Sequence, residues 1–339
     1  MASPGRAGPS TPRQDLGDDV AAPTSESLVH APLIDPWIRK VVFLGTGTSG
    51  QIPAAPCVLP KAQGRKRCEA CADAIRPGSK NRRGCCSAMV IGAGLDGVEH
   101  VILIDCGPTF YESALNAFRQ HKQRRITALL LTHAHADAML GLDSLRAWTM
   151  RGAIQQQIDV YCTQEAFEGV QNTFPYLVDE SKATGDGSVG ALKFHLIDPA
   201  RPFEIDAGKG PIQDVSGKAL LIEPLLVEHG LTSEGASFPC LGFRIGSLAY
   251  ISDVSSIPPS TRSKLKGARV LVIDSLSPRR HISHYSLAQA VEESLRVAAL
   301  NAEGEQDGPR LELALLTDLA HGLEHHSTDQ ALLSFVAGL

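Results

Sequence analysis

The chain has 339 residues, of which 43% are hydrophobic and 20% are charged, a composition typical of a globular protein with a substantial core. Its formal net charge is −5, which argues against a broad basic surface for nucleic acid or for anionic membranes. No apolar run reaches the ~18 residues that a membrane span requires. We therefore expect neither a membrane nor a large nucleic-acid surface among the partners.

The eight cysteines are unevenly spaced in a large chain, which is unlike a secreted disulfide framework. Three of them, Cys106, Cys162 and Cys240, lie in apolar, strand-like surroundings where buried thiols are ordinary. This usage favours a reducing compartment. We expect a cytoplasmic protein, and targeting to an organelle stays open.

Residues 1–36 are rich in Pro, Gly, Ser and Asp and contain no apolar segment of the kind found in signal peptides. The acids Asp15, Asp18 and Asp19 disfavour a transit peptide. We expect a disordered tail over 1–36, followed by one domain over 37–339.

Alternating and continuous apolar runs predict strands and helices that follow one another along the domain. Strands are expected at 39–45, 87–93, 100–107, 126–132, 157–163, 191–198, 219–229, 240–246, 248–253, 268–274 and 311–317. Helices are expected at 108–121, 141–152, 164–174, 258–267, 286–300 and 327–338. This order indicates a mixed α/β fold with two sheets.

Ligating side chains recur where the predicted strands end, and binding sites commonly form there in α/β folds. A single histidine beside a strand is usually a satisfied core residue, but repetition at five strand ends favours a site. Imidazole and carboxylate ligands together suit zinc, iron or manganese. The residues concerned are His133, His135 and Asp137 in "LLLTHAHAD", His229, Asp253, Asp274, Asp318 and His321.

Cys57, Cys68 and Cys71 form a second candidate cluster in a loop over 57–71. The C-x₂-C spacing of the last two allows two thiolates to reach one tetrahedral zinc ion. Three cysteines need a fourth ligand, for which a distant histidine is suitable. The alternative is that these residues are ordinary loop thiols.

The motifs "THAHAD", "LIDCG", "VEHG" and "YISD", in this order, resemble the metallo-β-lactamase superfamily. More narrowly, "FLGTGTSGQIP", the cysteine loop, "PGSKNRRG", "FYESAL" and "HISHYSL" resemble the PhnP-type branch, whose members include phosphoribosyl cyclic phosphate phosphodiesterases. The resemblance runs from about residue 41 to 326. It implies an αββα sandwich with metal at the shared edge of two sheets.

The resemblance also implies roles for individual residues. His133, His135 and His229 would hold a first metal, Asp253 would bridge to a second, and Asp137 would belong to that second site. Asp105 in "LIDCG" would orient the motif loop through hydrogen bonds. The remaining implied roles are a structural zinc held by Cys57, Cys68, Cys71 and His321, and a phosphate contact or general acid at His284, with His281 beside it as a substrate contact. Independently of the resemblance, Arg82 and Arg83 could bind an anionic substrate, because arginine matches phosphate oxygens with two hydrogen bonds; the alternative is a solvated basic surface.

The sequence departs from the family pattern at two positions. Ala138 stands where the H-x-H-x-D-H motif has its last histidine, and Asp318 in "TDLAH" stands where a late metal-binding histidine is expected. Three alternatives stay open. The centre could hold one metal, with Asp137 acting on the water bound to it, or two metals, with an oxygen-rich second site that includes Asp318 and prefers Mn²⁺ or Mg²⁺. The third alternative is a protein that keeps the fold and has lost catalysis.

These features predict a hydrolase of the metallo-β-lactamase fold. It would use a metal-bound hydroxide at a Zn²⁺ or Mn²⁺ centre to cleave a small phosphodiester or nucleotide-like substrate. The rivals are an RNase Z-like tRNA 3′-processing endonuclease, disfavoured by the lack of a long inserted arm, a glyoxalase II-type thioesterase or lactonase, and a non-catalytic zinc-binding protein. A homodimer stays open.

Overall fold

The computed structural model describes residues 35–60, 68–182, 190–302 and 309–337, all of which belong to one compact unit over 31–339. The tail expected over 1–36 lies outside the described residues, apart from its last two positions. So does the middle of the cysteine loop.

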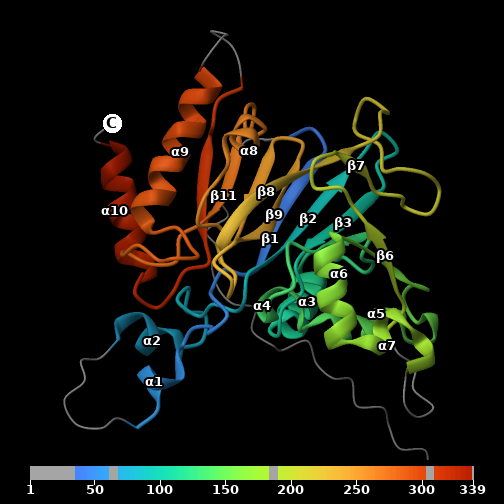
Figure 1. Ribbon diagram of the computed structural model, residues 1–339, viewed down its shortest axis with the longest axis horizontal. Coiled ribbons are helices and arrows are strands. Elements are labelled where there is room, and N and C mark those ends of the chain that lie inside the picture. The colour runs from blue at the N-terminus through green and yellow to red at the C-terminus, as the bar shows by residue number, and fades with distance from the viewer. Residues whose placement is uncertain (1–34, 61–67, 183–189, 303–308, 338–339) are drawn as a thin grey trace, which may run out of the picture. The chain divides into compact units, whose positions relative to one another are not determined.

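Two six-stranded sheets form the centre of this unit (Figure 1). Sheet 1 has the order β1-β2-β3-β4-β5-β6, and sheet 2 the order β12-β11-β10-β9-β8-β7. The strands of sheet 1 are β1 (Ile38–Gly45), β2 (Ser87–Ala93), β3 (Glu99–Ile104), β4 (Ala128–Leu130), β5 (Ile158–Cys162) and β6 (Leu192–Leu196). Those of sheet 2 are β7 (Phe203–Glu204), β8 (Leu221–Leu231), β9 (Ser237–Ile245), β10 (Leu248–Ile251), β11 (Val270–Asp274) and β12 (Leu313–Thr317).

The apolar side chains of each sheet divide between its two faces, because successive residues of a strand point in opposite directions. In β3, Ile102 and Ile104 enter the core between the two sheets, whereas Val101 and Leu103 enter the core beneath sheet 1. In β11, Val272 likewise joins the central core and its neighbours join a third core beneath sheet 2. Strands buried on both faces account for the continuous apolar runs in the sequence.

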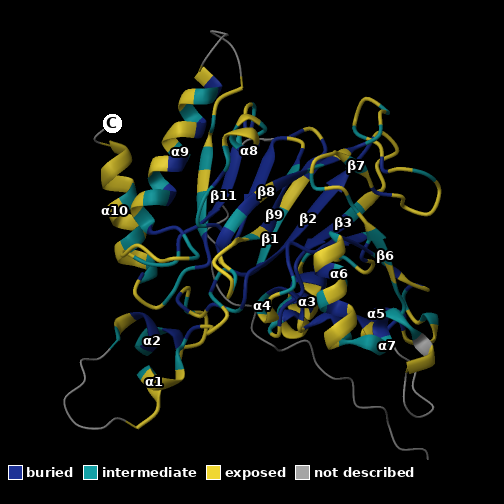
Figure 2. Cartoon of the chain, viewed as in Figure 1, coloured by how far each residue is buried: buried dark blue, intermediate teal, exposed yellow. Residues whose placement is uncertain are grey.

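Helices cover the outer faces of both sheets and complete four layers (Figure 2). Phe110, Trp148 and Val170 pack under sheet 1, and Ala290 and Val297 pack under sheet 2. The helices, with the short 3₁₀ turns labelled η, are α1 (Ala55–Val58), α2 (Glu69–Ala74), α3 (Phe110–Gln120), α4 (Ala136–Met139), η1 (Leu142–Leu145), α5 (Arg146–Thr149), η2 (Met150–Gly152), α6 (Gln164–Thr173), α7 (Pro175–Val178), η3 (Glu180–Lys182), α8 (Pro259–Ser263), α9 (Leu287–Ala302) and α10 (His325–Ala337). The predicted αββα sandwich is confirmed.

Each strand predicted from the sequence has a counterpart, and the differences are in short elements. The two-residue strand β7 and the helices α1, α2, α4 and α7 were not predicted, because so few residues carry no clear periodicity. The single helix expected over 141–152 is divided into three pieces, and it ends where Arg151 adopts a left-handed backbone with φ 52°. Among the described helices, none has the length and apolar character that crossing a bilayer requires.

Parallel pairing brings several strand ends to one edge of each sheet. β3 and β4 are parallel in sheet 1, and β10, β11 and β12 are parallel in sheet 2. Because the carboxyl ends of parallel strands lie together, the residues that follow them meet at that edge. Most of the predicted ligating residues follow or end these strands, and His229 lies near the end of β8.

Gly92 in β2 leaves room for the buried ring of Trp37. A Cβ atom at position 92 would lie 2.3 Å from Cε3 of that ring. We expect Gly92→Ala to lower the free energy of unfolding by about 1–3 kcal/mol, because the ring or the strand must shift. Gly50→Ala is the matched control, since its nearest contact would be an ordinary 3.6 Å to Oγ1 of Thr48. Chemical denaturation of both variants measures the difference, and equal stabilities would contradict this account.

Candidate metal centre

Three histidines meet at the edge formed by the ends of β4 and β8. His133 and His135 follow β4, and His229 lies near the end of β8. One ligating nitrogen from each lies within 4.8 Å of the others. Ligands around one ion at 2.0–2.1 Å are separated by at most ~4.2 Å, so a small adjustment lets all three imidazoles coordinate the same ion.

The hydrogen bonds of His133 fix which of its nitrogens faces this cluster. The Thr132 hydroxyl donates to the Asp105 carboxylate, whose oxygens lie 2.9 and 3.0 Å from Oγ1. That hydroxyl therefore accepts from Nδ1 of His133 at 2.8 Å. The other nitrogen, Nε2, is buried and finds no hydrogen-bond partner in the described part of the chain. An unprotonated, unpartnered imidazole nitrogen fits a metal ligand.

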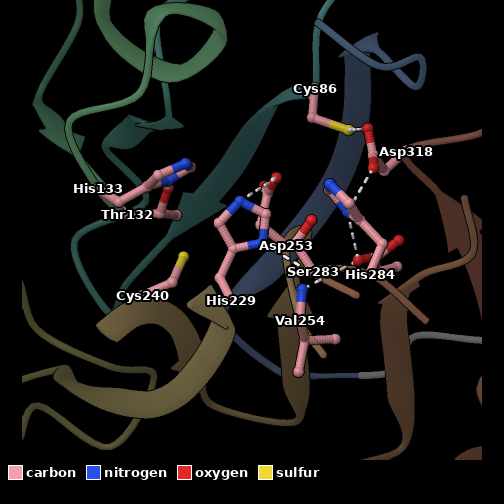
Figure 3. Close-up of polar contacts among 12 residues, drawn as sticks. Cys86, Thr132, His133, His229, Cys240, Asp253, Val254, Ser283, His284 and Asp318 are labelled. Carbon is pink, nitrogen blue, oxygen red and sulfur yellow. Dashed lines mark hydrogen bonds and ion pairs between the residues drawn. The ribbon is translucent and has the colours of Figure 1, made fainter. Parts of the chain in front are cut away.

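His229 is oriented in the same way by a backbone group. Its Nδ1 donates to the carbonyl oxygen of Ser283 at 2.8 Å, which leaves Nε2 free to face the cluster. Nε2 lies 3.9 Å from Oδ1 of Asp253. Figure 3 shows His133, His229 and Asp253 grouped on one side of the site.

Burial and neighbouring charges keep this donor set in the protonation state that binds a cation. Burial lowers the pKa of His133 to about 3 and also lowers the pKa of His229, so both rings stay neutral. The pKa of Asp253 lies below its usual value despite burial, which would raise it, because three imidazoles that can carry positive charge surround its carboxylate. Neutral imidazoles beside a carboxylate fit zinc or another divalent first-row ion.

The residues expected for a second metal do not gather in one place. Asp318 clusters with Asp274 and His284, and Asp137 belongs to none of the clusters of three or more ligating atoms found among the described residues. Burial, and then the charge of Asp253, raise the pKa of Asp137. Ala138 is only 3% exposed and packs into the apolar core beneath sheet 1. The second metal site therefore stays a prediction.

His284 is held between two buried carboxylates. Its Nδ1 donates to Oδ2 of Asp274 at 2.9 Å and lies 2.9 Å from Oδ2 of Asp318 (Figure 3). Burial lowers the pKa of His284, but these two carboxylates outweigh it and raise the pKa to about 11. The ring also contacts His229, with centroids 4.7 Å apart. His284 thus places a cationic imidazole beside the three-histidine cluster.

The predicted cysteine cluster also comes together. Ligating atoms of Cys57, Cys68, Cys71 and His321 lie within 4.8 Å of one another, and Sγ of Cys57 and Sγ of Cys68 each lie 3.3 Å from Nδ1 of His321. The backbone N–H of Ala54 donates to Sγ of Cys71 at 3.3 Å. All eight cysteines are unpaired. Three sulfurs and one imidazole are a donor set that fits a structural zinc.

The expected substrate contacts differ in their surroundings. His281 is exposed and lies beside His284, with ring centroids 5.4 Å apart, and Arg82 is exposed. Arg83 is 3% exposed, and its guanidinium donates to Asn81 Oδ1 and to three backbone carbonyls of residues 319–323. The terminal nitrogens of Arg83 thus link parts of the protein, and its substrate contact stays a prediction.

Sequence reasoning counted Asp274 only among the candidate ligating residues and assigned no role to Thr132 or Ser283, although each supports a histidine of the site. Asp274 was visible only as a polar residue ending a buried strand. The signal for Thr132 was its place directly before the first motif histidine. Ser283 acts through its backbone carbonyl, which no sequence pattern shows.

Replacing the Thr132 hydroxyl tests the orientation of His133. We expect Thr132→Val to weaken zinc binding at the histidine cluster by about 10–100-fold, the usual effect of losing a group that supports a metal ligand. Thr173→Val, an exposed threonine of α6 whose hydroxyl bonds only to Gly169, is the control. Competition with a chelator measures both affinities, and equal values would contradict the proposed orientation.

The two clusters are expected to bind metal independently. Cys71→Ser should lose one zinc ion per chain and leave the histidine cluster loaded, whereas His135→Ala should lose a different ion. Metal analysis of both variants and of the double variant measures this. Loss of the same ion in both single variants would contradict two separate clusters.

Comparison with known proteins agrees with this geometry. The family model described as the beta-lactamase superfamily domain matches residues 100–302. A crystal structure of a diphosphatase from the PhnP family is 25% identical, covers 86% of this chain and 90% of its own, and superposes with a TM-score of 0.60. The Zn²⁺-bound PqqB from Methylobacterium extorquens is 17% identical over 87% of this chain and 95% of its own, with a TM-score of 0.54.

A curated relative points to a different context. The octanoyltransferase of Porphyromonas gingivalis is 28% identical over 256 residues, which are 75% of this chain but only 42% of that protein. The chain thus spans less than half of the length of this relative. With its four-layer sandwich, its histidine and cysteine clusters, and the matched family model, the chain belongs to the metallo-β-lactamase superfamily and is PhnP-like.

Proposed function

We propose that this protein is a metal-dependent phosphodiesterase. The observation that carries the proposal is the position of His284, which Asp274 and Asp318 hold directly beside the three-histidine cluster. A cationic imidazole next to a metal centre suits a reaction in which an anionic substrate loses an oxygen leaving group. The diphosphatase of the PhnP family, a similar protein, acts by its name on phosphorus–oxygen bonds.

His133, His135, His229 and Asp253 would hold the catalytic ion. A divalent ion there supplies Lewis acidity and lowers the pKa of water bound to it. The protein must orient the ligands before the ion arrives, and it does so through Thr132 and the Ser283 carbonyl. Pre-oriented ligands reduce the conformational entropy lost on binding.

The surrounding residues supply proton transfers for hydrolysis. Asp137 lies in the first turn of the helix that follows His135, and its raised pKa, caused by burial and Asp253, suits a group that accepts a proton from the attacking water. The new phosphorus–oxygen bond forms from that water. The ester bond breaks with its electron pair on the leaving oxygen, which takes a proton from Nε2 of His284. The products are a phosphomonoester and an alcohol.

The proposal is tested with two aryl phosphodiesters that differ in their leaving group. Zinc- or manganese-loaded protein should hydrolyse both, and His284→Ala should lower kcat by about 10²–10⁴-fold for the poor phenyl leaving group, the range for a lost general acid. The kcat of this variant for the nitrophenyl ester should fall less, since the leaving oxygen of that ester needs little protonation. His326→Ala, an exposed histidine with no assigned role, is the control.

Asp253→Ala separates this activity from a contaminant. The variant should lose hydrolysis of both esters, because it removes a charged member of the centre. Equal rates for wild type and Asp253→Ala, or no hydrolysis by loaded wild type, would refute the phosphodiesterase proposal.

A second candidate is hydrolysis of an acyl ester or thioester. The similarity to a protein named an octanoyltransferase favours it, because that name denotes acyl chemistry. The same loaded protein should then cleave an octanoyl thioester faster than an aryl phosphodiester. Measuring kcat/KM for the two substrates in one preparation decides between the candidates.

A further inference from the structure

Asp318 is engaged on the His284 side of the site. It is 2% exposed, and its Oδ2 lies 2.9 Å from Nδ1 of His284. Its Oδ1 faces the Cys86 thiol, at a sulfur–oxygen distance of 4.0 Å. The thiol and His284 thus lie against different oxygens of one carboxylate (Figure 3).

The backbone at Asp318 supports this placement. Its φ of 55° lies in the left-handed region, which residues other than glycine rarely adopt. Neighbouring hydrogen bonds hold the turn in this conformation: Leu319 N–H donates to the Thr46 carbonyl and Ala320 N–H to the Leu276 carbonyl, both at 2.9 Å. Such a conformation persists because the surrounding structure determines it, and here it directs the carboxylate to His284.

Asp105 gives an internal parallel. It too is a buried aspartate with a left-handed backbone, at φ 60°, and it supports His133 through Thr132. Asp318 supports His284 directly. In both cases the left-handed backbone conformation belongs to an aspartate that supports a histidine of the site.

A role of Asp318 as a metal ligand would compete with these contacts. The clusters that include His133, His135, His229 or Asp253 contain no oxygen of Asp318 among the residues described. Asp318 groups instead with Asp274 and His284, and an ion bound to its Oδ2 would take the place next to that oxygen that the His284 ring now holds. Ala138, at the other altered motif position, offers no ligating atom.

We propose that Asp318 is a positioning residue for His284, acting with Asp274, and that the catalytic centre consequently holds one metal ion. The two carboxylates occupy Nδ1 of His284 and leave Nε2 as the nitrogen that faces the centre. Only the kinetic consequence rests on the proposed phosphodiesterase function. The metal count and the state of the ring are independent of it.

Metal analysis of the full-length protein, saturated with Zn²⁺ or Mn²⁺ and then desalted, gives the first test. Wild type should retain two ions per chain, one in each cluster, and Cys71→Ser should retain one. Asp318→Asn should retain two, as should the control Asp329→Asn, which changes an exposed aspartate of α10. Three ions in wild type, or the loss of one ion in Asp318→Asn, would overturn the proposal. The wild-type count does not depend on the folding of any variant.

Nuclear magnetic resonance of ¹⁵N-histidine-labelled protein gives the second test. The His284 signals, assigned by their absence in His284→Ala, should show a protonated Nδ1 in wild type. Asp318→Asn should shift these signals and leave those of His133 and His229 in place. Unchanged His284 signals together with shifted signals of the metal-binding histidines would contradict positioning.

A double-mutant cycle gives the third test. Asp318→Asn should lower kcat by about 10–100-fold on the phenyl phosphodiester, a typical effect for a supporting residue, and should lower it no further in the His284→Ala background. Independent, additive losses would contradict action through His284. If loaded wild type cleaves no phosphodiester, the proposed function fails, while the metal count and the ring signals still decide the role of Asp318.

Discussion

The turn over 317–323 is the constraint on which both candidate metal clusters depend. It carries Asp318 to His284 in the one cluster and His321 to the cysteines in the other. The buried guanidinium of Arg83 donates to three carbonyls of this turn. A buried cation is tolerated only where its donors are satisfied, so Arg83 and the turn stabilise each other. The basic segment that contains Arg83 therefore holds in place the turn that contributes a residue to each of the two clusters.

Neighbouring groups with fixed positions also determine how the histidines of the histidine cluster are oriented. His133 and His284 are each directed by a group at a sheet edge, since Thr132 follows β4 and Asp274 ends β11, whereas His229 is directed by the Ser283 carbonyl. Because strand ends are rigid, the side chains that follow them need few further contacts to hold their orientation. The site is thus assembled from two sheets and requires little movement of the chain to bind an ion.

Most of the fold was predictable from the sequence, since buried strands appear as apolar runs and the ligating residues follow them directly. The motif around His133 and His135 was visible for the same reason. The contacts of Arg83 were not, because they join segments more than 200 positions apart, and the contact between Asp318 and His284 was not, because it depends on the packing of β12 against β11. A basic run looks the same whether it faces solvent or an internal turn. Likewise, an aspartate at a motif histidine position does not show whether it faces a metal or another side chain.

The two departures from the family motif make physical sense together. Asp253, Asp274 and Asp318 are all buried, and their charges repel one another, as the raised pKa of Asp318 reflects after the larger effect of burial. In a two-metal centre, the second cation would offset such charge. Here the imidazolium of His284 lies against two of these carboxylates and supplies positive charge at their side of the site. Ala138 offers no ligand for a second ion, and Asp318 lies against His284. Under the proposed single-metal centre, both departures therefore act in the same direction, from a second metal toward a fixed proton donor.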